Sequence, residues 1–297
     1  MRKAACLTRR EFLSLLALAA TPATGADKRS TFKIIGFIKP FQKLTFEQIA
    51  DTAREAGWSG IECPLRKGGA IEPVRVEDDL PKLLEALRQR ELDIPVISTD
   101  VEDASDPLTR RVLNTASKLG IQRYRMKHYY YDLNQPIAPQ LENFRAKLRD
   151  LAQFNRELNI QGSIQNHSGR NYVGAPVWDI HELIRDLEPK AIGIFFDIGH
   201  ASIEGGYSWP IEAKLMESRF SVISVKDFTW TKTNGTWRAE WCPLGQGMIR
   251  SDFFKSLRKT AFNGPITIQF EYDMGSGKEM IAAMRRDLDV LKGWLAV

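Results

Sequence analysis

Helix gives way to strand within the segment Ala56-Gly57-Trp58-Ser59-Gly60-Ile61-Glu62-Cys63, and the same kind of transition recurs along the chain. Apolar residues at three- and four-residue intervals lead up to Gly57, and a β-rich run follows it. Glycine adopts the left-handed conformation that ends many helices, so it marks the helix stop. Leu119-Gly120-Ile121 and Phe262-Asn263-Gly264-Pro265 repeat this punctuation. At these three places a helix is expected to end just before the next strand begins.

Eight β-rich runs alternate with eight amphipathic helical segments, an order typical of parallel strands joined by crossover helices. The predicted strands are Lys33–Phe37, Gly60–Cys63, Ile94–Thr99, Arg123–Lys127, Gly162–Asn166, Ile192–Asp197, Val222–Lys226 and Ile266–Glu271. The predicted helices are Thr45–Ala56, Asp79–Glu91, Pro107–Leu119, Pro139–Leu158, Val177–Leu187, Pro210–Met216, Ser251–Thr260 and Lys278–Trp294. Eight repeats favour closure into a single (β/α)8 TIM barrel over residues 27–297.

An open, doubly wound sheet is the rival architecture. The first predicted strand is not followed by the Gly-x-Gly-x-x-Gly turn that cradles a dinucleotide phosphate. The sequence therefore favours the barrel and predicts no nucleotide cofactor.

The N-terminus resembles an export signal. Thr8-Arg9-Arg10-Glu11-Phe12-Leu13 is followed by a short apolar run to Ala20 and then by small residues to Ala26. This order is typical of a twin-arginine leader, and the apolar run is shorter than the roughly 20 residues that span a bilayer. We expect residues 1–26 to be a cleaved signal read by the twin-arginine export machinery. The mature protein is then periplasmic or secreted, without a stable membrane anchor. An N-terminal amphipathic helix or an uncleaved anchor is the alternative.

Charge and cysteine content bear on possible partners and on disulfide bonding. The formal charge of +5 falls to +2 without residues 1–26, which hold four basic residues and one acidic residue. Both signs are mixed along the predicted helices, so a nucleic-acid partner is not expected. Cys63 and Cys242 remain after cleavage, and the sequence leaves open whether they form a disulfide.

Unusual polar residues follow the predicted strand ends, where the active sites of such barrels lie. Five strands contribute them: Glu62, Gln165-Asn166-His167, Asp197 with His200, Lys226-Asp227, and Glu271. A carboxylate after an apolar strand needs a cation, a donor or a metal. Asp197 therefore predicts a site, and capping of a following helix is its other reading. Two of the four histidines, His167 and His200, follow strand ends, which favours a functional role.

Several motifs together resemble the sugar phosphate isomerase/epimerase family, a group of xylose isomerase-like TIM barrels that includes tagatose epimerases and apurinic endonucleases. The likeness extends over essentially the whole mature chain. The motifs are Gly57–Glu62, Gln165-Asn166-His167, Asp197-Ile198-Gly199-His200, Val225-Lys226-Asp227, Pro243-Leu244-Gly245-Gln246-Gly247 and Gly264–Glu271.

The resemblance implies one divalent cation, of Mn, Mg, Co or Zn, held by a Glu, an Asp, a His and a Glu on the last four strands. Carried over by position, these ligands fall on Gln165, Asp197, Ser224 and Glu271, so two of the four differ. Gln165 retains an oxygen for a hard cation, whereas Ser224 is too short to replace imidazole. The sequence therefore predicts a degenerate site at Ser224 and weak metal binding at most.

In this family a cation and acid–base groups move a proton on the carbon next to a carbonyl, through an enediolate. Lys226 lies on the same strand face as Ser224, so we hypothesise that its ammonium supplies the missing positive charge. His200 and Glu271 are then the proton-transfer groups. The predicted substrate contacts are Glu62, His128, Asn166 and His167, and Trp230, Trp237 and Trp241 either stack on sugar or form a hydrophobic lid.

These features predict an exported sugar isomerase/epimerase-like enzyme that acts on a free sugar or keto-sugar. Two alternatives remain: a lyase acting on 3-keto-glycosides, and a non-catalytic sugar-binding barrel with a degenerate metal site. The expected ligand is a small carbohydrate. The oligomeric state is left open. Phosphodiester cleavage requires a multi-metal cluster and more histidines than the four in this chain.

Overall fold

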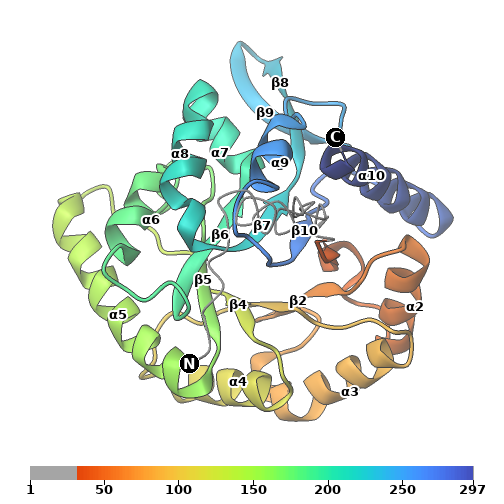
Figure 1. Ribbon diagram of the computed structural model, residues 1–297, viewed down its shortest axis with the longest axis horizontal. Helices are drawn as coiled ribbons and strands as arrows, with labels where there is room; N and C mark the ends of the chain where they lie inside the picture. The colour runs from red at the N-terminus through yellow and green to blue at the C-terminus, as the bar shows by residue number, and fades with distance from the viewer. Residues whose placement is uncertain (1–31, 297) are drawn as a thin grey trace, which may run out of the picture. The chain divides into compact units, whose positions relative to one another are not determined.

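The computed structural model describes residues 32–296, so the predicted leader lies outside the described residues. Eight parallel strands close a barrel in the order β1-β10-β7-β6-β5-β4-β3-β2 (Figure 1). Their bounds are β1 Ile34–Phe37, β2 Ile61–Leu65, β3 Val96–Thr99, β4 Arg123–Arg125, β5 Gln161–Gln165, β6 Ile192–Asp197, β7 Phe220–Val225 and β10 Ile266–Ile268. The predicted (β/α)8 barrel is confirmed, while the domain boundary at residue 27 stays a prediction.

A ring of helices surrounds the barrel (Figure 1). The helices are α2 Phe46–Ala56, α3 Val76–Arg88, α4 Pro107–Lys118, α5 Ile137–Leu158, α6 Val177–Ile184, α7 Ile198–Gly205, α8 Trp209–Met216, α9 Asp252–Leu257 and α10 Lys278–Ala296. Thr45 begins α2 with a capping box, and Gly57 ends it at φ 83°. Gly120 follows α4 at φ 84°. These two glycine stops therefore act as predicted, whereas the third prediction was wrong, because α9 ends at Leu257 and Gly264 does not lie at positive φ. Within residues 32–296, no helix has the length and apolarity needed to cross a membrane.

Two features were not predicted as elements. Helix α7 starts directly after β6, and an antiparallel hairpin of β8 (Asp227–Thr233) and β9 (Thr236–Cys242) follows β7. The hairpin turns at Asn234-Gly235, with φ values of 52° and 81°. Asn-Gly favours this tight turn because both residues tolerate positive φ. The hairpin extends outward beside α7 and α9 (Figure 1).

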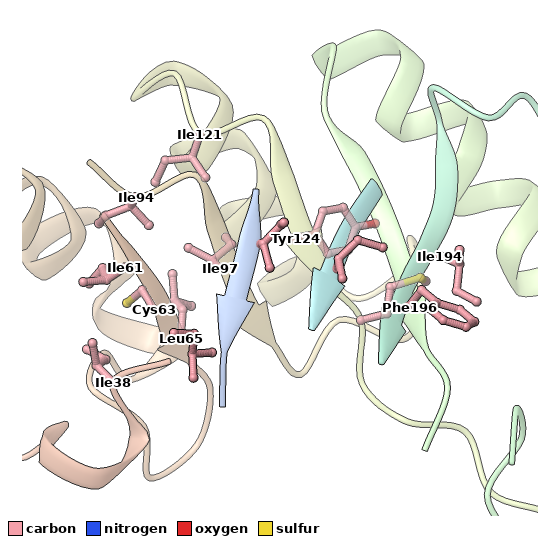
Figure 2. Packing of buried hydrophobic residues seen from close by; sticks show 14 of the residues in the cluster. Ile38, Ile61, Cys63, Leu65, Ile94, Ile97, Ile121, Tyr124, Ile194 and Phe196 are labelled. Atoms are coloured by element: carbon pink, nitrogen blue, oxygen red, sulfur yellow. The ribbon is translucent and has the colours of Figure 1, made fainter. Parts of the chain in front are cut away.

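The side chains of each strand point alternately outward, to a core between barrel and helices, and inward, to the barrel interior. Outward side chains such as Ile61, Cys63 and Leu65 pack toward the helices (Figure 2). Inside the barrel, Ile35, Val96, Phe195 and Val222 form a separate buried cluster. Since successive strand residues point to opposite faces, polar residues placed between the outward ones point inward, and the register pairs Glu62 with Val96 and Gln165 with Phe195 of this cluster. The barrel interior thus holds apolar and polar side chains beside each other.

Both cysteines of the described chain are free. Cys63 is fully buried in the outer core, and its burial raises the pKa of the thiol. Cys242 ends β9 in the hairpin. The structure therefore leaves the two thiols unpaired, the outcome that the sequence could not decide.

Candidate active site

A buried polar network crosses the barrel interior near the carboxyl ends of the strands. Its members come from five strands and are at most 5% exposed: Glu62 on β2, Gln165 on β5, Asp197 on β6, Lys226 after β7 and Gln269 after β10. Buried polar groups need partners, because an unmade hydrogen bond in the interior costs free energy. Each of these side chains indeed contacts another member of the network.

Lys226 is the positive centre of the network. Its Nζ lies 3.2 Å from Oδ2 of Asp197 and donates to Oε1 of Gln269 at 3.1 Å. The same ammonium lies 4.9 Å from the centre of the Trp241 ring, in cation–π contact. Gln165 donates from Nε2 to Oδ2 of Asp197 at 3.0 Å. The chain therefore holds its own cation against a buried carboxylate.

Asp197 caps a helix, as its sequence position suggested, and its carboxylate also faces a cation. Its Oδ1 accepts from the backbone N–H of His200 at 3.1 Å and so caps α7. Asn166 holds the backbone of Asp197 from both sides, accepting from its N–H at 2.8 Å and donating to its carbonyl at 2.9 Å. These contacts fix the carboxylate beside Lys226.

Three histidines form a cluster at one side of this network, with their rings tilted or edge-on to one another. The ring centres of His128 and His167 lie 4.9 Å apart, and those of His167 and His200 lie 3.9 Å apart. Nδ1 of His200 is hydrogen-bonded to Oγ of Ser168 at 2.7 Å. Its Nε2 has no hydrogen-bond partner in the described part of the chain and lies 3.9 Å from Oδ2 of Asp197.

The environment keeps these imidazoles neutral. Burial, and then the nearby Lys226 ammonium, lower the pKa of His167 to about 4 and that of His200 well below its usual value. For His128 the causes are burial and then Arg125, which also lower its pKa. A neutral imidazole can accept a proton. The three clustered histidines are therefore unprotonated at ordinary pH, and each keeps a lone pair that can accept a proton.

A second chain of hydrogen bonds links Glu62 to the histidine cluster through Ser98 and Arg125. The Glu62 carboxylate accepts from Ser98, from Thr267 at 2.8 Å and from Gln269 at 3.1 Å. Arg125 donates from Nε to Oγ of Ser98 at 3.1 Å, and its Nη1 lies 2.9 Å from Nε2 of His128. Burial lowers the pKa of Arg125 to about 10, so it remains charged at neutral pH.

The structure gathers most of the predicted site residues in one cluster. Those within it are Glu62, His128, Gln165, Asn166, His167, Asp197, His200 and Lys226. Their predicted roles remain predictions. Arg125, Ser98, Ser168 and Gln269 were missed. For Arg125 a signal was present, because a charged side chain within a buried strand requires an inward polar environment.

Glu271 follows the end of β10 by three residues. Its Oε2 accepts from Nζ of Lys39 at 2.9 Å, and its side chain is 24% exposed. Parallel register pairs Ile268 with Val225, which puts Gln269 level with Lys226. Gln269, two residues before the predicted Glu271, thus contacts Lys226 and Glu62 in the buried network, and the role of Glu271 stays a prediction.

The residues present do not fit a divalent metal. The four positions onto which the ligands were carried hold Gln165, Asp197, Ser224 and Glu271, with no imidazole among them. Of the two carboxylates, Glu271 is paired with Lys39 and Asp197 is the one in the buried network. Oγ of Ser224 is buried without a partner among residues 32–296. The Lys226 ammonium, 3.2 Å from the Asp197 carboxylate, would repel a second cation. Among residues 32–296, no three His, Cys, Asp or Glu side chains are grouped for metal binding.

Asp227 fixes the base of the β8–β9 hairpin. Its carboxylate accepts four backbone N–H groups at 2.9 Å, from Phe228, Gly245, Gly247 and Ile249. A Cβ at Gly247 would lie 2.3 Å from Oδ1 of Asp227, so only glycine fits there. Two of the motifs noted in the sequence, Val225-Lys226-Asp227 and Pro243–Gly247, are therefore two halves of one structural joint.

Comparisons with known proteins agree with this architecture. The family model described as xylose isomerase-like TIM barrel matches residues 50–294. An uncharacterised protein of Methanocaldococcus jannaschii is 25% identical over 135 residues, which is 45% of this chain and 44% of that protein. The chain thus spans less than half the length of this curated relative.

Two solved structures are similar in fold. A D-psicose 3-epimerase with D-tagatose, from Clostridium cellulolyticum, has a TM-score of 0.67 at 12% identity and covers 89% of this chain and 99% of its own. A xylose isomerase-like TIM barrel protein from Mycobacterium smegmatis, in complex with magnesium, has a TM-score of 0.63 at 16% identity, over 90% and 99%. At such identities the likeness concerns the fold alone.

Proposed function

This chain belongs to the xylose isomerase-like TIM barrel family, and from that premise we propose a sugar isomerase/epimerase-like enzyme that needs no divalent metal. It moves a proton on the carbon next to the carbonyl of a free sugar or keto-sugar. One observation carries the proposal: the Lys226 ammonium is held at the site by Asp197 and Gln269, beside buried neutral histidines.

Lys226 is the proposed electrophile, the group that stabilises negative charge on the carbonyl oxygen. An ammonium can donate three hydrogen bonds. One goes to Gln269, and Asp197 lies in ion-pair contact at 3.2 Å. We assign a remaining N–H of Lys226 to a substrate oxygen. As the carbonyl oxygen gains negative charge in the enediolate, a fixed cation in a dry site stabilises it more than water does.

His200 is the proposed base. If its Nδ1–H donates to Ser168, then Nε2 carries the lone pair, and this atom is unpartnered in the site. Epimerisation also needs a group that returns the proton. We assign this to His167, whose ring centre lies 3.9 Å from that of His200, rather than to Glu271, which is paired with Lys39. The pKa values of both imidazoles are lowered, so both are unprotonated at ordinary pH and each keeps a lone pair.

Export is part of the proposal. It rests on the leader sequence of residues 1–26, which favours passage through the twin-arginine machinery and a periplasmic or secreted location. A free sugar suits that location better than a sugar phosphate, because sugar phosphates are made and kept inside cells. The second candidate is a lyase acting on 3-keto-glycosides, which also begins by removing the proton on the carbon next to the carbonyl. The exposed tryptophans of the hairpin favour this candidate.

Hydrogen exchange tests the proposal directly. The purified protein is incubated with D-fructose, D-tagatose and a 3-keto-glucoside in deuterated water, and deuterium at the carbon next to the carbonyl is measured by NMR. We expect exchange by the wild type and a loss of about 10²–10⁴-fold in His200→Ala. His181→Ala, which removes the fourth histidine, on α6, is the matched control and should stay within about twofold of the wild type. Absence of exchange by the wild type would favour a non-catalytic sugar-binding barrel.

A further inference from the structure

The two faces of the β8–β9 hairpin differ in chemistry. Directly opposed residues of an antiparallel pair share a face. The register pairs Phe228 with Trp241, Trp230 with Ala239 and Lys232 with Trp237. One face therefore carries four aromatic rings, which we call the aromatic face: Phe228, Trp230, Trp237 and Trp241. The other face carries threonines with Arg238 and Glu240.

The aromatic face begins inside the candidate site. Trp241 lies 4.9 Å from Nζ of Lys226, and its ring centre is 5.2 Å from that of His200. Phe228 contacts Trp241 at 6.3 Å and Trp230 at 5.7 Å between ring centres. Three rings in contact, Trp241, Phe228 and Trp230, thus lead from the proposed reaction centre outward along the hairpin, and Trp237 lies further out on the same face.

The outer rings of the aromatic face are exposed. Trp230 is 43% exposed and Trp237 is 62% exposed, whereas Phe228 is buried. Together the two exposed indoles offer an area comparable to one whole ring, about 250 Å² at most. A stable protein interface buries about 800 Å² on each partner. The exposed aromatic area is therefore too small to hold a second protein by itself, and it suits a smaller ligand.

The hairpin is anchored rather than loose at its base. The four N–H groups that Asp227 accepts come from both sides of the hairpin, from Phe228 and from residues 245–249. Trp241 is further held by its contacts with Lys226 and His200. A surface fixed before binding loses less conformational entropy when a ligand binds.

We propose that the aromatic face binds the part of a glycoside or oligosaccharide that extends beyond the sugar held at Lys226. Sugar rings present apolar C–H faces with hydroxyl groups at their edges, which match an indole face and a neighbouring donor. Lys232, opposite Trp237, supplies such a donor. The inference rests on the proposed function and narrows its substrate class from a free monosaccharide to a sugar bearing a further saccharide or glycosidic group.

Calorimetric binding of glucose and xylose, compared with cellohexaose, maltohexaose and xylohexaose, tests the proposal. In the wild type at least one hexasaccharide should bind about tenfold or more tightly than its monosaccharide, since one stacked ring contributes on the order of 1 kcal/mol. In the double variant Trp230→Ala/Trp237→Ala that preference should fall by about tenfold. Trp178→Ala removes an exposed tryptophan on α6 and is the matched control, which should keep the wild-type preference.

The outcomes separate this inference from the proposed function. A preference for a hexasaccharide that is lost in the double variant supports the aromatic face, even where deuterium exchange is absent and the enzymatic proposal fails. Equal binding of monosaccharides and hexasaccharides by the wild type overturns it. So does a preference that survives in the double variant. If the wild type sediments as a dimer and the double variant as a monomer, the aromatic face binds a second copy of the chain. This outcome also overturns the inference.

Discussion

Replacing Lys226 by methionine tests the central ion pair of this protein. The substitution keeps the length of the side chain but removes the ammonium that lies 3.2 Å from Oδ2 of Asp197. At that distance and an effective dielectric constant of about 20, the pair attraction is about 5 kcal/mol. Removing one partner of a buried pair leaves the other charge uncompensated, which typically costs roughly 3–5 kcal/mol. We expect a loss of unfolding free energy of this size.

Urea denaturation and thermal melts measure this loss. For a domain of this size each kcal/mol lowers the melting temperature by roughly 2–4 °C, so a fall of about 6–20 °C is expected. Lys39→Met is the matched control, because its partner Glu271 lies at 2.9 Å but the pair is solvent-exposed. An exposed pair contributes about 0–1 kcal/mol. Adding Asp197→Asn to Lys226→Met should recover most of the loss, since asparagine still caps α7 and neither of these two positions then holds an unpaired charge.

The same variant tests catalysis. Without the ammonium, deuterium exchange next to the sugar carbonyl should fall by about 10²–10³-fold, the usual cost of removing a group that stabilises an oxyanion. The pKa of His167 should rise from about 4, because Lys226 is the second cause of its depression after burial. The reasoning is refuted if Lys226→Met costs no more stability than Lys39→Met, or if it exchanges deuterium at the wild-type rate.

Two further predictions concern the hairpin joint and the histidines. Asp227→Asn replaces an oxygen that accepts backbone N–H groups by an amide donor, so the free energy of unfolding in urea should fall by about 2–4 kcal/mol. An unchanged urea midpoint would contradict the stabilising role of Asp227 at the base of the hairpin. Because the pKa of His167 is about 4 and that of His200 is also lowered, exchange by neutral bases should stay constant from pH 8 to pH 6 and decline only toward pH 4. An acid limb centred near the ordinary imidazole value of about 6.5 would exclude both as the base.

The sequence predicted where the site residues lie more reliably than what they contact. Asp197, His200 and Lys226 were identified because polar residues after apolar strands stand out and because parallel strands end at a common edge. Gln269 was missed, since the end of β10 at Ile268 and its register with β7 depend on strands far apart in the chain. The Asn234-Gly235 turn of the hairpin was a local signal that the sequence contained and that was not used.

By itself, the order of residues determined the eightfold alternation of strand and helix, the glycine stops after α2 and α4 and the collection of polar side chains at one end of a barrel. These follow from periodicity and turn chemistry, which act over a few neighbouring residues. Only the tertiary structure decided that an ammonium lies against Asp197, and that the rings of the hairpin lead away from it. Those contacts join β6, β7 and β10 across the barrel, and their distances depend on strand register and closure, which are not local properties of the chain.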